Sequence, residues 1–125
     1  KVFIMQRFLT KLFAIGVILM TITVSTAHAD FIEPLGDVPL PPRFEIIEDS
    51  LFSFEQENGR VIEITIAGII PIENTRYFYN QSLINLGWSK IAQDKYIRDQ
   101  EELNLNYNRR DDNTTIIRIN LSPRP

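Results

Sequence analysis

The residues whose types and spacing come nearest to a catalytic group are six carboxylates in the second half of the chain: Asp94, Asp99, Glu101, Glu102, Asp111 and Asp112. A hydrolase that works with two carboxylates needs one as an acid with a raised pKa and the other as a base or nucleophile. The surroundings of these six are typical of solvated turns, because no apolar pattern places a pair of them in a pocket. A carboxylate-dependent hydrolase is therefore the alternative function, and no catalytic residue is assigned.

Other catalytic and metal-binding chemistries lack the residues they need. The chain has one histidine, His28, and no cysteine, which excludes disulfides, zinc–thiolate sites and cysteine nucleophiles. Ser89 and Lys90 are neighbours, but successive side chains of a strand point to opposite faces, so they do not form a Ser–Lys pair. Residues 111–113 lack the spacing of a calcium loop and are explained by turn formation. We expect neither a cofactor nor a metal site.

Residues 1–29 have the pattern of a signal peptide. Arg7 and Lys11 supply a positive region, and a run of uncharged, mostly apolar residues follows at 12–24. This run is shorter than the about 20 residues of a membrane-spanning helix. Cleavage is therefore expected, and a structural protein tethered to the membrane by an uncleaved signal is the alternative.

The histidine belongs to the predicted cleavage site. Ala27-His28-Ala29 has the small-x-small pattern that precedes a cleavage point, so we predict that the mature chain starts at Asp30. Met5 is a candidate start for the signal itself. The expected location of the mature protein is the periplasm or the exterior of a bacterial cell.

Cleavage changes the charge of the protein. The whole chain has a formal net charge of -3, and residues 1–29 contain three basic residues and no acidic one, so the mature chain keeps ten basic and 16 acidic residues. Nucleic-acid binding depends on Lys and Arg that neutralise phosphates. Nucleic acid is therefore excluded as a partner, and the mature form is not expected to be embedded in a membrane.

Residues 30–43 are predicted to be a proline-rich linker. Four of the seven prolines of the chain lie here, and proline favours extended chain that cannot join the interior of a sheet. A polyproline ligand at residues 40–43 is the alternative.

Residues 44–123 are predicted to form a small folded domain. Alternating apolar residues predict strands at 44–48, 51–55 and 61–69, and Pro71 and Gly87 bound a segment with the apolar spacing of a helix. Further strands are expected within 89–99, 103–107 and 114–121. Together these elements predict an α+β fold in which an antiparallel sheet of about six strands packs on one helix, in the order β-β-α-β-β-β-β.

Two hairpin registers follow from the requirement that apolar residues share one face. A three-residue loop at 57–59 would pair Phe54 with Ile62 and give Gly59 a positive φ, as the left-handed residue of that loop. A three-residue loop at 111–113 would pair Leu105 with Ile119.

The helix and its end carry a resemblance. Tyr77-Phe78-Tyr79, Leu83 and Leu86-Gly87-Trp88, followed by a hairpin and a final alternating strand, resemble small exported domains of Gram-negative bacteria of the alphaproteobacterial kind, with a helix of the form FYxxxLxxLGW. These domains have no established activity. The resemblance implies an exported location and a fold over about 44–123, and it transfers no functional residue.

These observations favour a non-catalytic binding or accessory protein of the cell envelope. Its partner would be another envelope protein or a small ligand, and no residue pattern specifies an oligomeric state. The expected contact surface is the sheet face opposite the helix, around Val61 and Ile116, and addition of an edge strand to a partner is one expected mode.

Overall fold

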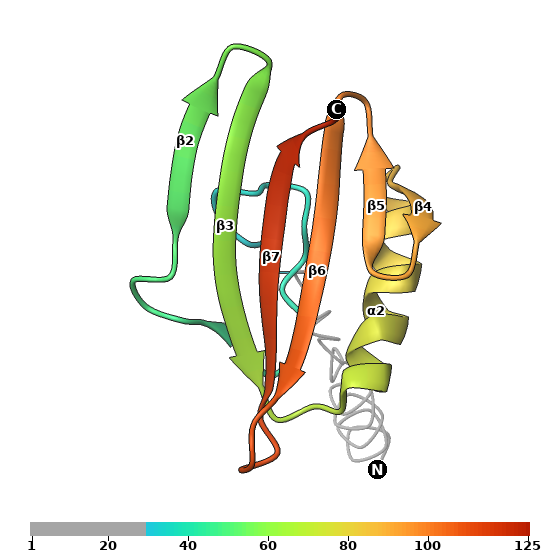
Figure 1. Ribbon diagram of the computed structural model, residues 1–125. Helices are drawn as coiled ribbons and strands as arrows, with labels where there is room; N and C mark the ends of the chain where they lie inside the picture. The colour runs from blue at the N-terminus through green and yellow to red at the C-terminus, as the bar shows by residue number, and fades with distance from the viewer. Residues whose placement is uncertain (1–29) are drawn as a thin grey trace, which may run out of the picture.

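The computed structural model describes residues 30–125, so the predicted signal peptide and its cleavage site at Ala27 and Ala29 lie outside the described residues. Within this part, seven strands and the helix α2 form an α+β fold, as predicted (Figure 1). The elements are β1 (Phe44–Ile46), β2 (Phe52–Gln56), β3 (Gly59–Gly68), α2 (Ile72–Asn85), β4 (Ser89–Ala92), β5 (Lys95–Arg98), β6 (Glu101–Arg109) and β7 (Thr115–Pro123).

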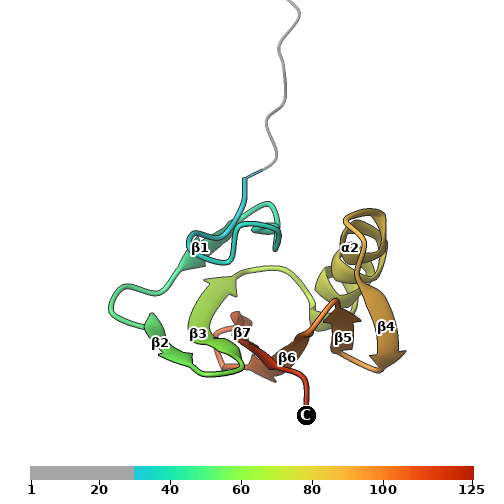
Figure 2. The ribbon, with the colours of Figure 1, turned by 90° about the horizontal axis from the view of Figure 1, so that it is seen from above.

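All seven strands belong to one antiparallel sheet, one strand more than the predicted count of about six. The strand order is β1-β3-β7-β6-β5-β4, and β2 also pairs with β3. β1 and β2 lie one after the other along the same edge of β3, because β1 pairs with its last residues and β2 with its first. The sheet is curved, and α2 and the segment before β1 lie on the same side of it (Figure 2).

The hairpin β6–β7 confirms the predicted register. Leu105 pairs with Ile119 and Tyr107 with Ile117, so that one face of both strands is apolar. The three-residue loop is closed by the Arg110 N–H, which donates to the Thr114 carbonyl at 2.9 Å. Asn113 supplies the left-handed residue of this loop with φ 66°.

Helix α2 begins and ends as its sequence predicts. Pro71 is the residue before the first helical turn, where a missing N–H costs nothing. Gly87 has φ 93°, and the N–H groups of Gly87 and Trp88 donate to the carbonyls of Ile84 and Leu83. This pair of hydrogen bonds is the Schellman arrangement, which satisfies two carbonyls of the last turn.

The core lies between the inner face of the sheet and the elements that cover it. Alternate residues in the central parts of the three longest strands are buried there, together with Tyr79 and Leu83 of α2 and Trp88 after it. The buried apolar residues of these strands are Ile62, Ile64 and Ile66 of β3, Leu103 and Leu105 of β6, and Ile117, Ile119 and Leu121 of β7.

The segment 30–43 is not a free linker, which corrects the prediction. Ile32, Leu35 and Val38 are completely or almost completely buried in the core. The segment folds back on itself, with the Ile32 N–H donating to the Val38 carbonyl at 2.9 Å, and Tyr79 donates its hydroxyl hydrogen to the Pro39 carbonyl at 2.8 Å. Helix α2 alone leaves part of the inner face of the sheet open, and the segment covers that part (Figure 2). The segment folds onto the sheet because its apolar residues between the prolines are removed from water there.

The predicted register of the first hairpin is also wrong. Phe54 pairs with Val61 and Ser53 with Ile62, so the phenylalanines lie on the outer face of the sheet. The loop is the two residues Glu57 and Asn58, neither of which has a positive φ, and Gly59 follows it with φ 141°. The positive φ of Gly59 is thus confirmed, although its place in the turn differs. All five residues of β2 are exposed, so the apolar pattern gains no core contact by choosing the other register.

Candidate interaction surface

The outer face of the sheet has no layer over it in the described part of the chain, and its centre is polar. Side chains on this face alternate with those of the core, so Asn104 pairs with Asn120 and Asn106 with Arg118 across β6 and β7. A shallow hollow of about 430 Å³ lies here, lined by Thr65, Asn106, Tyr107, Asn108, Ile116 and Arg118. An antiparallel sheet with one solvated face has this alternation. Val61 and Ile116 take outward positions on the same face, where the sequence placed them.

An aromatic pair lies at the margin of this outer face, on β2. Phe52 and Phe54 are 59 % and 40 % exposed, and their rings meet edge to face with centroids 5.3 Å apart. Sequence reasoning missed this pair, because it paired Phe54 with Ile62 and so expected the phenylalanines on the core face, whereas Phe54 pairs with Val61. A positive φ at Gly59 is compatible with both registers, so this residue alone does not reveal that the pair is exposed.

The two edges of the sheet differ in how open they are to another strand. β4 is short, has an irregular register between Lys90 and Ala92, and carries a lysine, all of which hinder pairing with another chain. β2 pairs with β3 through five consecutive residues without a bulge and contains no Lys, Arg or Pro. No strand of residues 30–125 pairs with the other edge of β2, which is the outermost strand in Figure 1.

Several of the carboxylates that suggested hydrolysis have a cation or a backbone N–H as their partner. Asp94 accepts two hydrogen bonds of 2.9 Å from Arg76, and Glu102 lies 3.4 Å from Lys95. Asp112 accepts from the Thr114 N–H in the β6–β7 loop, and hydrogen bonding to Thr114 lowers its pKa. A general acid needs the opposite shift, so this loop is explained by turn formation.

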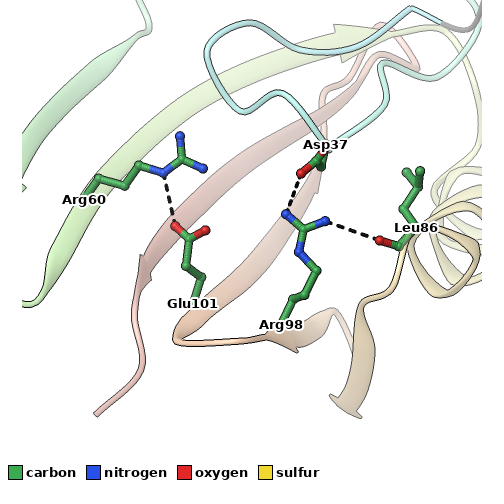
Figure 3. A network of polar contacts seen from close by, with 5 residues as sticks. All are labelled: Asp37, Arg60, Leu86, Arg98 and Glu101. Atoms are coloured by element: carbon green, nitrogen blue, oxygen red, sulfur yellow. Dashed lines mark hydrogen bonds and ion pairs between the residues drawn. The ribbon is translucent and has the colours of Figure 1, made fainter.

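Arg60 and Arg98 form ion pairs that join parts of the fold far apart in the sequence, as Figure 3 shows. Arg60 of β3 donates to Glu101 of β6 at 3.1 Å. Arg98 of β5 contacts the Asp37 carboxylate at 2.6 Å, donates to the Leu86 carbonyl at the end of α2, and lies over the Trp88 ring. The contacts of Arg98 hold the segment 30–43 and the end of α2 to the sheet, and the contact of Arg60 joins β3 to β6. Both arginines therefore have a structural role.

A second internal cluster lies between α2 and the strands β5 and β6. The Arg76 guanidinium is 4.9 Å from the centre of the Tyr107 ring, and Tyr96 donates its hydroxyl hydrogen to Asn80. Burial raises the pKa of both tyrosines, so they stay protonated at neutral pH and serve as packed polar groups.

The remaining sequence candidates are on the surface. Ser89 and Lys90 are exposed on β4 and face opposite sides, because Ser89 pairs with Ile97 and Lys90 with Tyr96. Among residues 30–125, no three His, Cys, Asp or Glu side chains gather closely enough to hold a metal ion. No helix in the same part of the chain is long and apolar enough to cross a membrane.

Comparison of the chain with protein-family models, with curated proteins and with solved structures gave no match.

Proposed function

We propose that this chain is an exported, periplasmic and non-catalytic binding protein, an accessory module of the cell envelope that contacts its partner at the β2 margin of the sheet. The observation that carries the proposal is the exposed pair Phe52 and Phe54. Aromatic side chains contribute strongly to protein interfaces, and this pair adds nothing to the core.

The export part of the proposal rests on the sequence of residues 1–29 and on the resemblance to small exported domains. The first residue after the predicted cleavage point already takes part in the fold, because the Asp30 carbonyl accepts a hydrogen bond from the Leu40 N–H at 2.8 Å. A mature chain that starts at Asp30 would keep every described contact.

The non-catalytic part is supported by the way in which the carboxylates are used. Arg76, Lys95 and Arg60 each form an ion pair with one of them, namely Asp94, Glu102 and Glu101. A mature chain without histidine and cysteine also lacks the commonest general base and the commonest thiol nucleophile.

The test is a crosslinked pull-down of the C-terminally tagged full chain from a Gram-negative host, with the intact mass read on the same sample. We expect a mass without residues 1–29 and one reproducible envelope protein. The double variant Phe52→Ser/Phe54→Ser should lose that protein. Ile91→Ser, which changes an equally exposed apolar residue on the other edge strand, is the matched control and should keep it.

Stability separates a contact role from a folding defect. Because all of β2 is exposed, the double variant should change the free energy of unfolding by less than about 1 kcal/mol. Capture of the same protein by the double variant would contradict the contact surface. A mass that retains residues 1–29 would support the tethered alternative.

A further inference from the structure

We propose that β2 binds an extended, basic segment of a partner protein as an additional antiparallel strand. This inference rests on the proposed function and names the chemistry of its partner. Three independent features of the β2 margin point to such a segment: the open hydrogen-bonding edge, the charge around it, and the different side chains on its two faces.

The first feature is the open edge. A strand at the edge of a sheet presents unpaired N–H and C=O groups that another extended chain can pair with. β2 offers five residues in regular register, and the devices that hinder pairing at β4, a bulge and a lysine, are absent from it. The added strand would continue the sheet beyond β2, on the side that is free in Figure 1.

The second feature is charge. Residues 44–59 contain five carboxylates and no Lys or Arg, and all five are exposed: Glu45, Glu48, Asp49, Glu55 and Glu57. None of the five forms an ion pair with another described residue, whereas Asp94, Glu101 and Glu102 elsewhere in the sheet each do. A basic partner would be attracted to this margin, and complementary charge also sets the orientation of binding.

The same charge argues against a second copy of this chain as the occupant. Pairing two β2 edges would place Glu55 and Glu57 of each copy along one seam, and β2 itself contains no Lys or Arg. Like charges across an interface are unfavourable. The occupant is therefore a different chain, with lysine or arginine where this one has glutamate.

The third feature is the alternation along β2. Phe52 and Phe54 point to the outer face, while Ser53 and Glu55 occupy the positions on the inner face. Side chains directly opposite each other on paired strands interact. The added strand would thus present apolar residues toward the phenylalanines and basic residues toward Glu55, which is a period of two.

Peptide binding to the purified full chain tests the inference. The probe is a blocked, fluorescent ten-residue peptide of alternating Val and Lys, and the matched probe has Glu in place of every Lys. Fluorescence anisotropy should show binding of the Val–Lys peptide that is at least about tenfold tighter and that weakens with salt. Equal binding of both peptides would overturn the charge argument.

Two methylated peptides test strand addition itself. One Val–Lys peptide is N-methylated at every Val, and the other at every Lys. In an added antiparallel strand, the N–H groups of alternate residues point to the same edge, so with Val on the outer face either the Val or the Lys N–H groups face β2. The peptide methylated at those groups should lose at least about tenfold in affinity, and the other should not. Equal affinity of the two methylated peptides would overturn binding as an added strand.

Charged variants test which edge is used. Ser53→Lys places a cation on the β2 edge and should weaken binding of the Val–Lys peptide, and Ile91→Lys on β4 is the control that should not. If Ile91→Lys weakened binding and Ser53→Lys did not, the peptide would bind at β4, which would overturn the proposal. A concentration-dependent dimer in sedimentation equilibrium that Ser53→Lys abolishes would show that a second copy is the occupant, and would overturn the proposal.

The two proposals can fail separately. If no peptide binds at up to about 1 mM, a weak limit for any specific contact, while the pull-down still depends on Phe52 and Phe54, the strand inference fails and the binding function stands. If peptides fail to bind and the pull-down captures nothing that depends on these residues, both fail.

Discussion

At the scale of single residues, the hydroxyl of Tyr79 joins two parts of the chain that are 40 residues apart. Tyr79 is fully buried and donates to the buried carbonyl of Pro39 at 2.8 Å. We expect Tyr79→Phe to lower the free energy of unfolding by about 1–2 kcal/mol, because that carbonyl loses its donor. Urea unfolding measures the change. Tyr77→Phe, on the exposed side of the same helix, is the control and should stay within about 0.5 kcal/mol. Equal effects of the two variants would contradict the role of the hydrogen bond.

Gly68 shows a close approach that the sequence pattern does not reveal. A Cβ at this position would lie 2.7 Å from the Arg43 carbonyl oxygen and 2.7 Å from the Phe44 ring. Since the backbone oxygen cannot move aside as a side chain can, Gly68→Ala should lower the free energy of unfolding by about 1–3 kcal/mol. Thermal and urea unfolding check this. The control is Ile69→Ala at the exposed next residue, and a stable Gly68→Ala protein would show that β1 does not hold its place against β3.

At the scale of elements, helix α2 and the β6–β7 hairpin could be predicted from the sequence. Pro71 and Gly87 bound α2 because each fits one special backbone position. The β6–β7 hairpin was predictable because both strands reach the core, so a slip of one residue would have exposed Leu105 and Ile119.

The elements that the sequence did not predict lie at the margin of the core. The register of β2 could not be derived from alternation, because all five residues of the strand are exposed and no core contact selects one face. The role of residues 30–43 was hidden because proline content describes the backbone of the segment. The three buried side chains Ile32, Leu35 and Val38 recur every third residue, but Pro34 within the run argues against the helix that this spacing would suggest.

The candidate surface follows from the same margin. Its outward position at Val61 and Ile116 was predictable from the alternation of β3 and β7. The aromatic pair was not, since its exposure depends on the β2 register. The expectation of solvated turn groups fits the exposed Asp99, Asp111 and Asp112. It does not fit Asp94, Glu101 and Glu102, which are half-buried partners of cations that only the arrangement of the strands reveals.

At the scale of the whole molecule, residues 30–43 are part of the folded unit. Fully burying a side chain such as Val, Leu or Ile contributes about 1.5–3 kcal/mol, and three of them lie in this segment. A domain of this size has a total stability of only about 5–15 kcal/mol. We therefore expect that replacing residues 31–42 of the full chain by a Gly/Ser segment of equal length abolishes cooperative unfolding, as measured by near-UV circular dichroism. A variant that unfolds cooperatively at the wild-type urea concentration would restore the linker interpretation.

The buried tyrosines determine how the stability of the whole molecule changes at high pH. Burial raises the pKa of Tyr79, Tyr96 and Tyr107 above the ordinary value of about 10. Above that value the unfolded chain loses these protons while the folded chain keeps them, so the folded state binds more protons than the unfolded state. Stability then falls as the pH rises, and the contribution of these groups is fully present below about pH 9.

We expect the free energy of unfolding to decrease above pH 10, by up to about 1.4 kcal/mol per pH unit for each of the three tyrosines. Urea unfolding between pH 8 and pH 11 measures the decrease, and the absorbance at 295 nm reports the ionisation of the tyrosines as the chain unfolds. Lysine also titrates in this range, so the decisive measurement is the difference between the wild type and Tyr107→Phe. That variant has one buried phenol fewer, and its stability should depend less steeply on pH. Identical slopes for the two proteins would contradict a raised pKa of Tyr107 in the folded state.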